Sequence, residues 1–177
     1  MERPGDKGLT GGRLKLGRSR DRNVPAVFTP RRLEELSSPR LKEAFAVWQG
    51  KRGASDGLPA AADFDILDYR SVVGNINFLE VRSDPLDFIY RVHSATGAKY
   101  VGQDLTGRSI DDYRDPHYRD FIRASCLHAV QSKAPHFVVE ELFTADDRRM
   151  RWEAALLPLQ DEAGAVSRLV VPFEILN

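Results

Sequence analysis

The sequence predicts an α+β fold, a five-stranded antiparallel sheet with helices packed on one face. Two runs rich in β-branched and aromatic residues, 76–81 and 88–93, flank a segment with strong turn chemistry, 83–85. The last third of the chain, from about residue 136, alternates polar and apolar residues with a period of two. Between these parts lies a helical segment whose apolar stripe must be buried, so a two-layer domain satisfies both patterns.

The composition is that of a water-soluble protein with one core. The chain has 177 residues, of which 42% are hydrophobic and 29% are charged. No apolar run approaches the roughly 20 residues that a membrane span needs. The single cysteine, Cys126, has no partner for an internal disulfide, and no hydrophobic signal segment follows Met1. We therefore expect a cytoplasmic protein without membrane contact.

The charge is unevenly distributed, which divides the chain into three predicted parts. Residues 1–32 hold nine Lys and Arg against three acidic residues, and five glycines. Such a segment buries too little surface to offset its ordering entropy, so 1–30 are predicted to be a flexible basic tail. Residues 31–57 form an N-terminal helix with a linker, and 58–177 form the main domain. The tail is interpreted as a solubilising leader, with an arm for nucleic acid, anionic lipid or an acidic partner as the alternative.

The N-terminal helix begins at Ser38 and Pro39, a capping residue followed by a proline at the first helical position. It ends by Gly50. Its apolar residues fall at helical spacing, so the stripe either covers the domain or contacts a second copy. We predict a homodimer or partner contact through three of them: Leu41, Phe45 and Trp48.

The main domain follows in order. One or two helical turns are predicted within 63–73, then the strands 76–81 and 88–93, and a short helix over 95–101. A loop with one turn of helix covers 102–113, and the longest helix runs from about 116 to 133, where Pro135 follows. Three strands connected by hairpin turns close the chain, at 136–144, from 149, and at 167–176.

Several motifs between about residues 41 and 175 resemble the PAS domain, and within it the bacterial single-domain PAS proteins of the α-proteobacterial type. These are Trp48 with Lys51-Arg52-Gly53, the Leu58-Pro59 step, the run FIYRV at 88–92, and GQDLTG at 102–107, which is the most specific. One departure is Ser94-Ala95, where the family usually has Gly-Thr. The resemblance implies a PAS-like sheet and a module that senses or pairs, with no enzymatic activity and no catalytic residue.

The residues themselves offer no dedicated site for catalysis or metal. A hydrolase needs a nucleophile within reach of a base, and the chain shows no such motif. Its four histidines and one cysteine lack metal-ligand spacing, so no metal is predicted.

A ligand pocket, if present, is predicted between the sheet and the helices. Its polar contact would be a tyrosine hydroxyl or Arg91. His128 lies near the apolar face of the long helix, where a neutral imidazole could ligate haem iron, although we favour a boundary histidine. No flavin motif of the light-oxygen-voltage type is present, so the cofactor is left unassigned. The pocket candidates are Tyr90, Val92, Tyr100, Tyr113, Phe121, Ile122, His128, Trp152 and Phe173.

Three classes of function remain open. The favoured one is a PAS-type sensory and protein-interaction module in bacterial signalling, which acts in trans on a signalling partner and binds a small ligand. The alternatives are a nucleic-acid-associated protein that uses the basic tail, and a small-molecule isomerase or hydrolase on a similar sheet.

Overall fold

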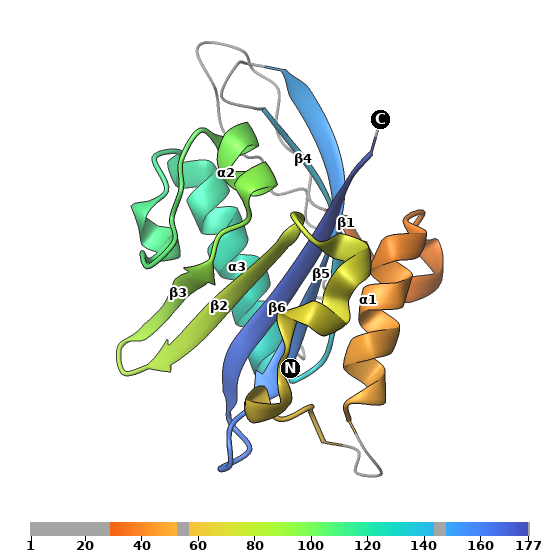
Figure 1. Ribbon diagram of the computed structural model, residues 1–177. Helices are drawn as coiled ribbons and strands as arrows, with labels where there is room; N and C mark the ends of the chain where they lie inside the picture. The colour runs from red at the N-terminus through yellow and green to blue at the C-terminus, as the bar shows by residue number, and fades with distance from the viewer. Residues whose placement is uncertain (1–28, 53–56, 144–147, 177) are drawn as a thin grey trace, which may run out of the picture.

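Antiparallel strands form a single sheet in the computed structural model, which describes residues 29–52, 57–143 and 148–176 (Figure 1). The predicted basic tail lies outside these residues, apart from its last two. Along the sheet the order is β1-β4-β5-β6-β2-β3. The strands are β1 (Thr29–Arg31), β2 (Ile76–Ser83), β3 (Leu86–Val92), β4 (His136–Phe143), β5 (Arg149–Gln160) and β6 (Val166–Leu176). The five long strands confirm the predicted sheet, and the three-residue β1 extends it by pairing with β4.

The sheet has two faces, because successive side chains of a strand point to opposite sides. On β5, Trp152 and Ala154 lie on one face, which we call the inner face, and Glu153 and Ala155 lie on the other, the outer face. Residues that pair across two strands point to the same face, so Phe173 of β6, which pairs with Ala154, also lies on the inner face. The two faces therefore have separate partners.

The inner face is covered by α2 (Ala95–Val101), the single turn η4 (Ile110–Asp112) and α3 (Pro116–Ser132), as the sequence predicted (Figure 1). The ends of α2 match the prediction because both carry a clear signal. The Ser94 hydroxyl accepts a hydrogen bond from the Gly97 amide at 3.0 Å. Gly102 ends the helix with φ of +74°, a left-handed conformation that glycine adopts without strain.

The outer face is covered by α1 (Pro39–Gly50) and by η3 (Ile66–Val72), which pack against each other (Figure 1). Trp48 is 1% exposed, and its indole nitrogen donates to the Pro158 carbonyl of β5 at 2.9 Å. Phe45 meets the ring of Phe137 edge to face. The helical stripe thus belongs to the core of its own chain, and the sheet is covered on both faces.

This placement corrects the role that the sequence suggested for α1. Leu41 and Trp48 are at most 1% exposed, and Phe45 is half-buried against the core. Three side chains so enclosed are not a free surface for a second copy or a partner. The amphipathic pattern correctly identified the buried face of the helix. The same pattern arises whether that face packs against another chain or against the outer face of the sheet.

A buried carboxylate fastens the start of α1 to the sheet. Glu153, which is 2% exposed, accepts hydrogen bonds from the Ser37 amide at 2.7 Å, the Ser37 hydroxyl at 2.6 Å and the Ser38 amide at 2.8 Å. Ser38 is also the N-cap of α1, through its hydroxyl and the Leu41 amide. We call Glu153 with Ser37 and Ser38 the serine clamp.

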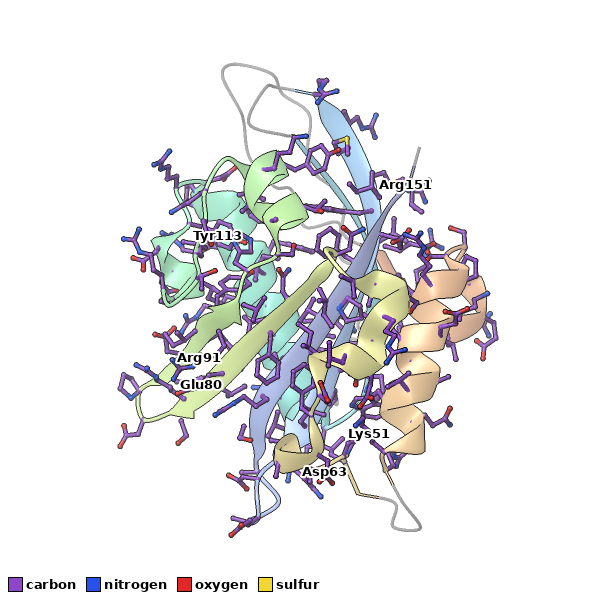
Figure 2. All side chains as sticks on the ribbon, in the orientation of Figure 1. Lys51, Asp63, Glu80, Arg91, Tyr113 and Arg151 are labelled. Carbon is purple, nitrogen blue, oxygen red and sulfur yellow. The ribbon has the colours of Figure 1, made fainter. Side chains whose placement is uncertain are left out.

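Two short turns complete the described chain, η1 (Leu33–Glu35) before α1 and η2 (Ala61–Asp63) after it. The Lys51 ammonium, directly after α1, donates to the Asp63 carbonyl of η2 at 2.7 Å and so connects the two elements (Figure 2). Within the described ranges, no helix has the length and apolarity required to cross a membrane.

Candidate functional site

A cavity of about 40 Å³ lies between the inner face of the sheet and the helices that cover it. One buried water needs roughly 10–15 Å³ of such volume, so the cavity has room for a few waters or for a molecule of similar size. Its lining combines aromatic rings, aliphatic side chains and a few polar groups. The lining residues are Asn77, Leu79, Tyr90, His93, Gly97, Val101, Tyr113, Tyr118, Ile122, Ser125, Cys126, Trp152, Ala154, Leu156, Val171 and Phe173.

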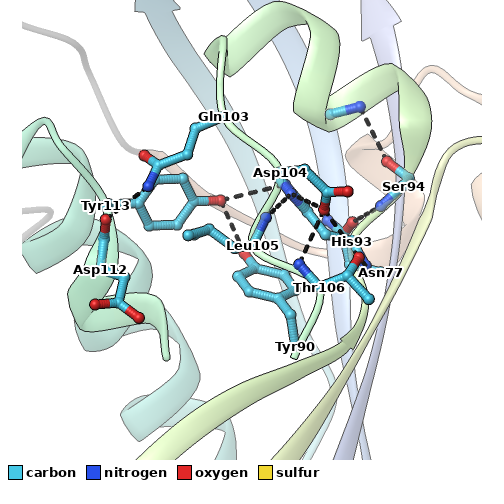
Figure 3. Close-up of polar contacts among 11 residues, drawn as sticks. Asn77, Tyr90, His93, Ser94, Gln103, Asp104, Leu105, Thr106, Asp112 and Tyr113 are labelled. Atoms are coloured by element: carbon cyan, nitrogen blue, oxygen red, sulfur yellow. Dashed lines mark hydrogen bonds and ion pairs between the residues drawn. The ribbon is translucent and has the colours of Figure 1, made fainter. Parts of the chain in front are cut away.

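A chain of hydrogen bonds crosses the cavity wall (Figure 3). The Tyr90 and Tyr113 hydroxyls lie 3.0 Å apart, and the Tyr113 hydroxyl lies 3.5 Å from Nε2 of His93. The Leu105 amide donates to Nδ1 of His93 at 3.1 Å. Since Nδ1 accepts this bond, the ring proton of the neutral imidazole is on Nε2 and faces Tyr113. The backbone thereby fixes the direction of the first bond in the chain.

Burial keeps His93 neutral. It lowers the pKa of His93 below the ordinary value of 6.5, and the nearby Asp104 carboxylate only partly opposes this effect. The Asp104 carboxylate is itself committed to the Thr106 amide and hydroxyl, both at 2.9 Å, and the amide bond is the first cause of its lowered pKa. Desolvation likewise raises the pKa of Tyr90 well above 10. The chain of groups is therefore uncharged.

The GQDLTG segment, 102–107, holds His93 in place. Its Leu105 amide makes the bond to the ring, and the Thr106 hydroxyl accepts from the His93 amide at 3.3 Å. The Gln103 side chain donates to the Asp112 carbonyl at 2.8 Å, which ties the loop to η4. The most specific motif of the sequence thus positions one residue of the cavity wall, His93, without lining the cavity itself.

The start of α2 approaches His93 closely. A Cβ atom at Gly97 would lie 3.0 Å from the Ser94 hydroxyl and 3.4 Å from Nε2 of His93. The Ser94 amide donates to Oδ1 of Asn77 at 2.8 Å, which leaves the Asn77 amide nitrogen on the other side of that side chain. Ser94, at the position where the sequence departs from the family pattern, therefore both caps α2 and orients Asn77.

Trp152 carries a polar atom without a partner. Its ring lines the cavity and meets Phe173 edge to face, with centroids 5.0 Å apart. The indole nitrogen is buried and has no hydrogen-bond partner among the residues that the structure describes. A buried donor left unpaired costs about 1–3 kcal/mol. The hydroxyl of Tyr69 is in the same state, but Tyr69 belongs to η3 and meets Phe64 on the outer side of the sheet.

Five of the nine predicted pocket residues line the cavity: Tyr90, Tyr113, Ile122, Trp152 and Phe173. Val92 is absent because β3 has a bulge opposite Phe78 and Leu79, so that Val92 pairs with Phe78 while Tyr90 pairs with Leu79. Tyr90 and Val92 then point to opposite faces, whereas simple alternation would place them together.

The other predicted residues lie elsewhere. Phe121 is buried in a separate cluster with Tyr118 and Ile122, and Tyr100 is half-buried with the Lys99 ammonium over its ring. Arg91, the predicted polar contact, pairs with Glu80 at the surface, where its side chain is half exposed (Figure 2). These three do not line the cavity.

His128, the histidine considered for haem, is exposed and does not line the cavity. Its ring lies against the ring of His136 at an angle of 51°, with centroids 4.4 Å apart. Burial, and then the charge of His128, lowers the pKa of His136 to about 4. Within the described residues, no group of three or more histidine, cysteine or acidic side chains is placed to hold a metal ion.

The sequence reasoning missed the histidine, the asparagine and most of the α3 residues of the wall. Tyr118, Ile122, Ser125 and Cys126 repeat at helical spacing along α3, and all four line the cavity. The sequence showed this repeat in part, because Tyr118, Ile122 and Ser125 belong to the apolar stripe of the long helix. His93 gave no such signal, because its position depends on the GQDLTG segment that folds back over it.

Among the comparisons with known proteins, the match to a family model shows the family. A PAS domain family model matches residues 36–171. A light-oxygen-voltage domain studied with a flavin analogue is similar at 17% identity and a TM-score of 0.47, over 67% of this chain and 89% of that one. A sensory box sensor histidine kinase from Vibrio cholerae is similar at 14% and 0.46, over 63% of this chain and 90% of that one. A search of the curated proteins found no match.

The family match covers the sheet from β2 into β6, all three α-helices and every lining residue of the cavity except Phe173. PAS domains are generally sensory modules, and they commonly mediate protein interaction. This chain belongs to the PAS domain family.

Proposed function

We propose that this chain is a non-enzymatic PAS sensory module of the α-proteobacterial single-domain type, which binds a small molecule and acts in trans on a signalling partner in the cytoplasm. The observation that carries the proposal is the cavity itself. It is enclosed by rings and aliphatic side chains, with a fixed chain of polar groups from His93 through Tyr113 to Tyr90 in its wall. Such a combination is typical of small-molecule sites.

Strand β5 connects the cavity on the inner face with the helix that covers the outer face. Trp152 and Ala154 line the cavity, while the intervening Glu153 belongs to the serine clamp that holds α1. If β5 takes one position when α1 is attached and another when α1 is detached, a molecule that binds one of these positions more tightly would change the populations of the two states. Detachment of α1 would expose Leu41 and Trp48, which then become a surface for a second copy or a signalling partner. In this proposal, the homodimer contact predicted from the sequence forms only after α1 has detached from the sheet.

Native mass spectrometry of the protein purified without added cofactor tests the binding. The expected spectrum shows mass above the bare chain, which denaturation releases, and it also gives the number of subunits. Ala154→Leu fills the cavity and is expected to abolish the excess mass. Ala46→Leu makes the same change on the exposed side of α1 and is the matched control. A bare chain mass in the unaltered protein, or excess mass retained by Ala154→Leu, would contradict the proposal.

A further inference from the structure

Nδ1 of His93 faces two groups of the segment 102–107 that require opposite protonation states of it (Figure 3). The Leu105 amide donates a hydrogen bond to this nitrogen at 3.1 Å, which requires its lone pair. Oδ1 of the Asp104 carboxylate lies 3.7 Å from the same nitrogen and can bind it only when it carries a proton. One nitrogen cannot accept and donate at once. The protonation state of the ring therefore determines which neighbour it binds.

With a neutral ring, the segment is closed over His93. The Leu105 amide is bound to the ring, and the Leu105 side chain is fully buried. The Thr106 hydroxyl accepts from the His93 amide at 3.3 Å, while the Thr106 amide and hydroxyl both donate to Asp104 at 2.9 Å. Burial of the imidazole disfavours its charged form and lowers the pKa of His93 below 6.5. The closed arrangement is therefore the one adopted at neutral pH.

A proton on Nδ1 would remove the reason for that arrangement. Both ring nitrogens then donate, so the Leu105 amide faces a donor and has lost its acceptor. The Asp104 carboxylate gains a positively charged partner, and a bond to it requires the 3.7 Å separation to shorten to about 2.8 Å. Since Thr106 holds the same carboxylate oxygen, this movement displaces the segment as a whole. Asp104, Thr106 and Gly107 are exposed, so the change takes place at the surface.

The other titratable side chains that line the cavity with His93 are acids that are neutral when protonated. Burial raises the pKa of one of them, Tyr90, well above 10. The charged residue of α2, Lys99, has its ammonium over the Tyr100 ring. Within the described residues, the one carboxylate placed to pair with a protonated ring is that of Asp104. The neutral acids are Tyr90 of β3, Tyr113 after η4, and Tyr118 and Cys126 of α3.

We propose that His93 and Asp104 form a proton-driven latch: a proton on Nδ1 of His93 displaces the Leu105 amide, draws in the Asp104 carboxylate and opens the segment 102–107. The proton comes from solvent and adds to the nitrogen lone pair that the Leu105 amide had used, and no other covalent bond changes. Its route is short, because 66% of the Asp104 side chain is exposed. The latch goes beyond the sensing function proposed above, since it operates whether or not a molecule occupies the cavity.

Titration of the full chain by ¹H–¹⁵N NMR tests the latch, from about pH 8 down to about pH 5. This range stays above the pKa of His136, about 4, so that ring remains neutral. The ring nitrogens of His93 report its tautomer and charge, and the Leu105 and Thr106 amides report the segment. At the upper end, the ring proton is expected on Nε2. The ring should then become charged with a midpoint below pH 6.5, and the two amides should shift with the same midpoint. In the charged form the Leu105 amide should exchange about tenfold faster, because it has lost one hydrogen bond.

Asp104→Asn tests the role of the carboxylate. The amide keeps the size of the side chain and can still accept from Thr106, but it gives a protonated His93 no counter-charge, so the shared midpoint should move to lower pH. Asp112→Asn is the matched control, because Asp112 is an exposed carboxylate of η4 that pairs with a neighbouring arginine. Its loss should move the midpoint much less, since solvent screens its charge. His93→Gln offers the Leu105 amide a carbonyl that does not titrate, and it should remove the pH dependence of both amides.

Three results would overturn the latch: a His93 ring that stays neutral over the whole range, a ring that becomes charged while the Leu105 and Thr106 amides do not follow, or a midpoint in Asp104→Asn that equals or exceeds that of the unaltered protein. None of these outcomes depends on a bound molecule. A bare chain mass in native mass spectrometry refutes sensing and leaves the latch in place, whereas failure of the latch leaves the sensing function in place.

Discussion

The serine clamp should determine whether α1 stays on the sheet. Glu153 is 2% exposed, and its carboxylate accepts three hydrogen bonds. Two come from backbone amides, which can only donate, and the third comes from the Ser37 hydroxyl. Glu153→Gln keeps the size and shape of the side chain. It places an amide nitrogen where one carboxylate oxygen accepted, so at least one backbone amide of the clamp loses its acceptor.

The magnitude follows from the kind of bond that is lost. A hydrogen bond to a charged group contributes about 1.5–3 kcal/mol, and an unpaired buried donor costs about 1–3 kcal/mol. Glu153→Gln should therefore lower the free energy of unfolding by about 3 kcal/mol. In a domain of this size each kcal/mol moves the melting temperature by about 2–4 °C, so a fall of about 6–12 °C is expected.

Denaturant unfolding followed by circular dichroism, with hydrogen exchange of α1, measures both effects. Glu174→Gln is the matched control, because Glu174 lies opposite Glu153 on β6 and contacts the exposed Arg40 guanidinium at 3.4 Å. Its loss should cost at most about 1 kcal/mol. Equal shifts in the two variants, or unchanged exchange of α1 amides in Glu153→Gln, would refute the reasoning about the clamp.

Three further predictions concern stability, each read from denaturant or thermal unfolding. Gly107→Ala should cost about 1 kcal/mol, because φ is +79° there and no atom lies within 4 Å of an added Cβ; an unchanged midpoint would contradict the backbone argument. Trp48→Phe should cost about 2–3 kcal/mol, since it leaves the Pro158 carbonyl unpaired and the core underfilled. His136 has a pKa of about 4, below the ordinary 6.5, so the unfolded chain binds its proton more readily and stability falls as the pH drops from about 6.5 toward 4, by up to about 3 kcal/mol. His136→Phe should flatten that fall, and an equally steep fall would assign it to other groups.

The elements with local signals were the ones that the sequence could predict. The bounds of α2 follow from the Ser94 cap and from Gly102, and those of α1 from the Ser38 cap and Gly50. The strands β4 and β6 were predicted within one residue at each end, because turn residues bound them. These signals lie within a few residues of the structure that they determine.

The features that were missed depend on contacts between distant segments. The bulge that turns Val92 away from Tyr90 depends on pairing with β2. The side of the sheet that α1 covers depends on Glu153, more than 100 residues after the Ser38 cap. The ring of His93 is held in the cavity wall by a hydrogen bond from the Leu105 amide, which comes from a later segment of the chain. Neither periodicity nor capping contains that information.

The central claim is that an occupied cavity on one face of the sheet changes the helix on the other. Hydrogen exchange of the full chain tests it most directly, when the protein as purified, with its cavity occupied, is compared with the same protein refolded after the bound molecule has been removed. The account predicts slower exchange in the segments that line the cavity, β3 and α2, and faster exchange in α1, with both effects lost in Ala154→Leu. Exchange that changes only in the cavity lining, with α1 unaffected, would contradict the claim.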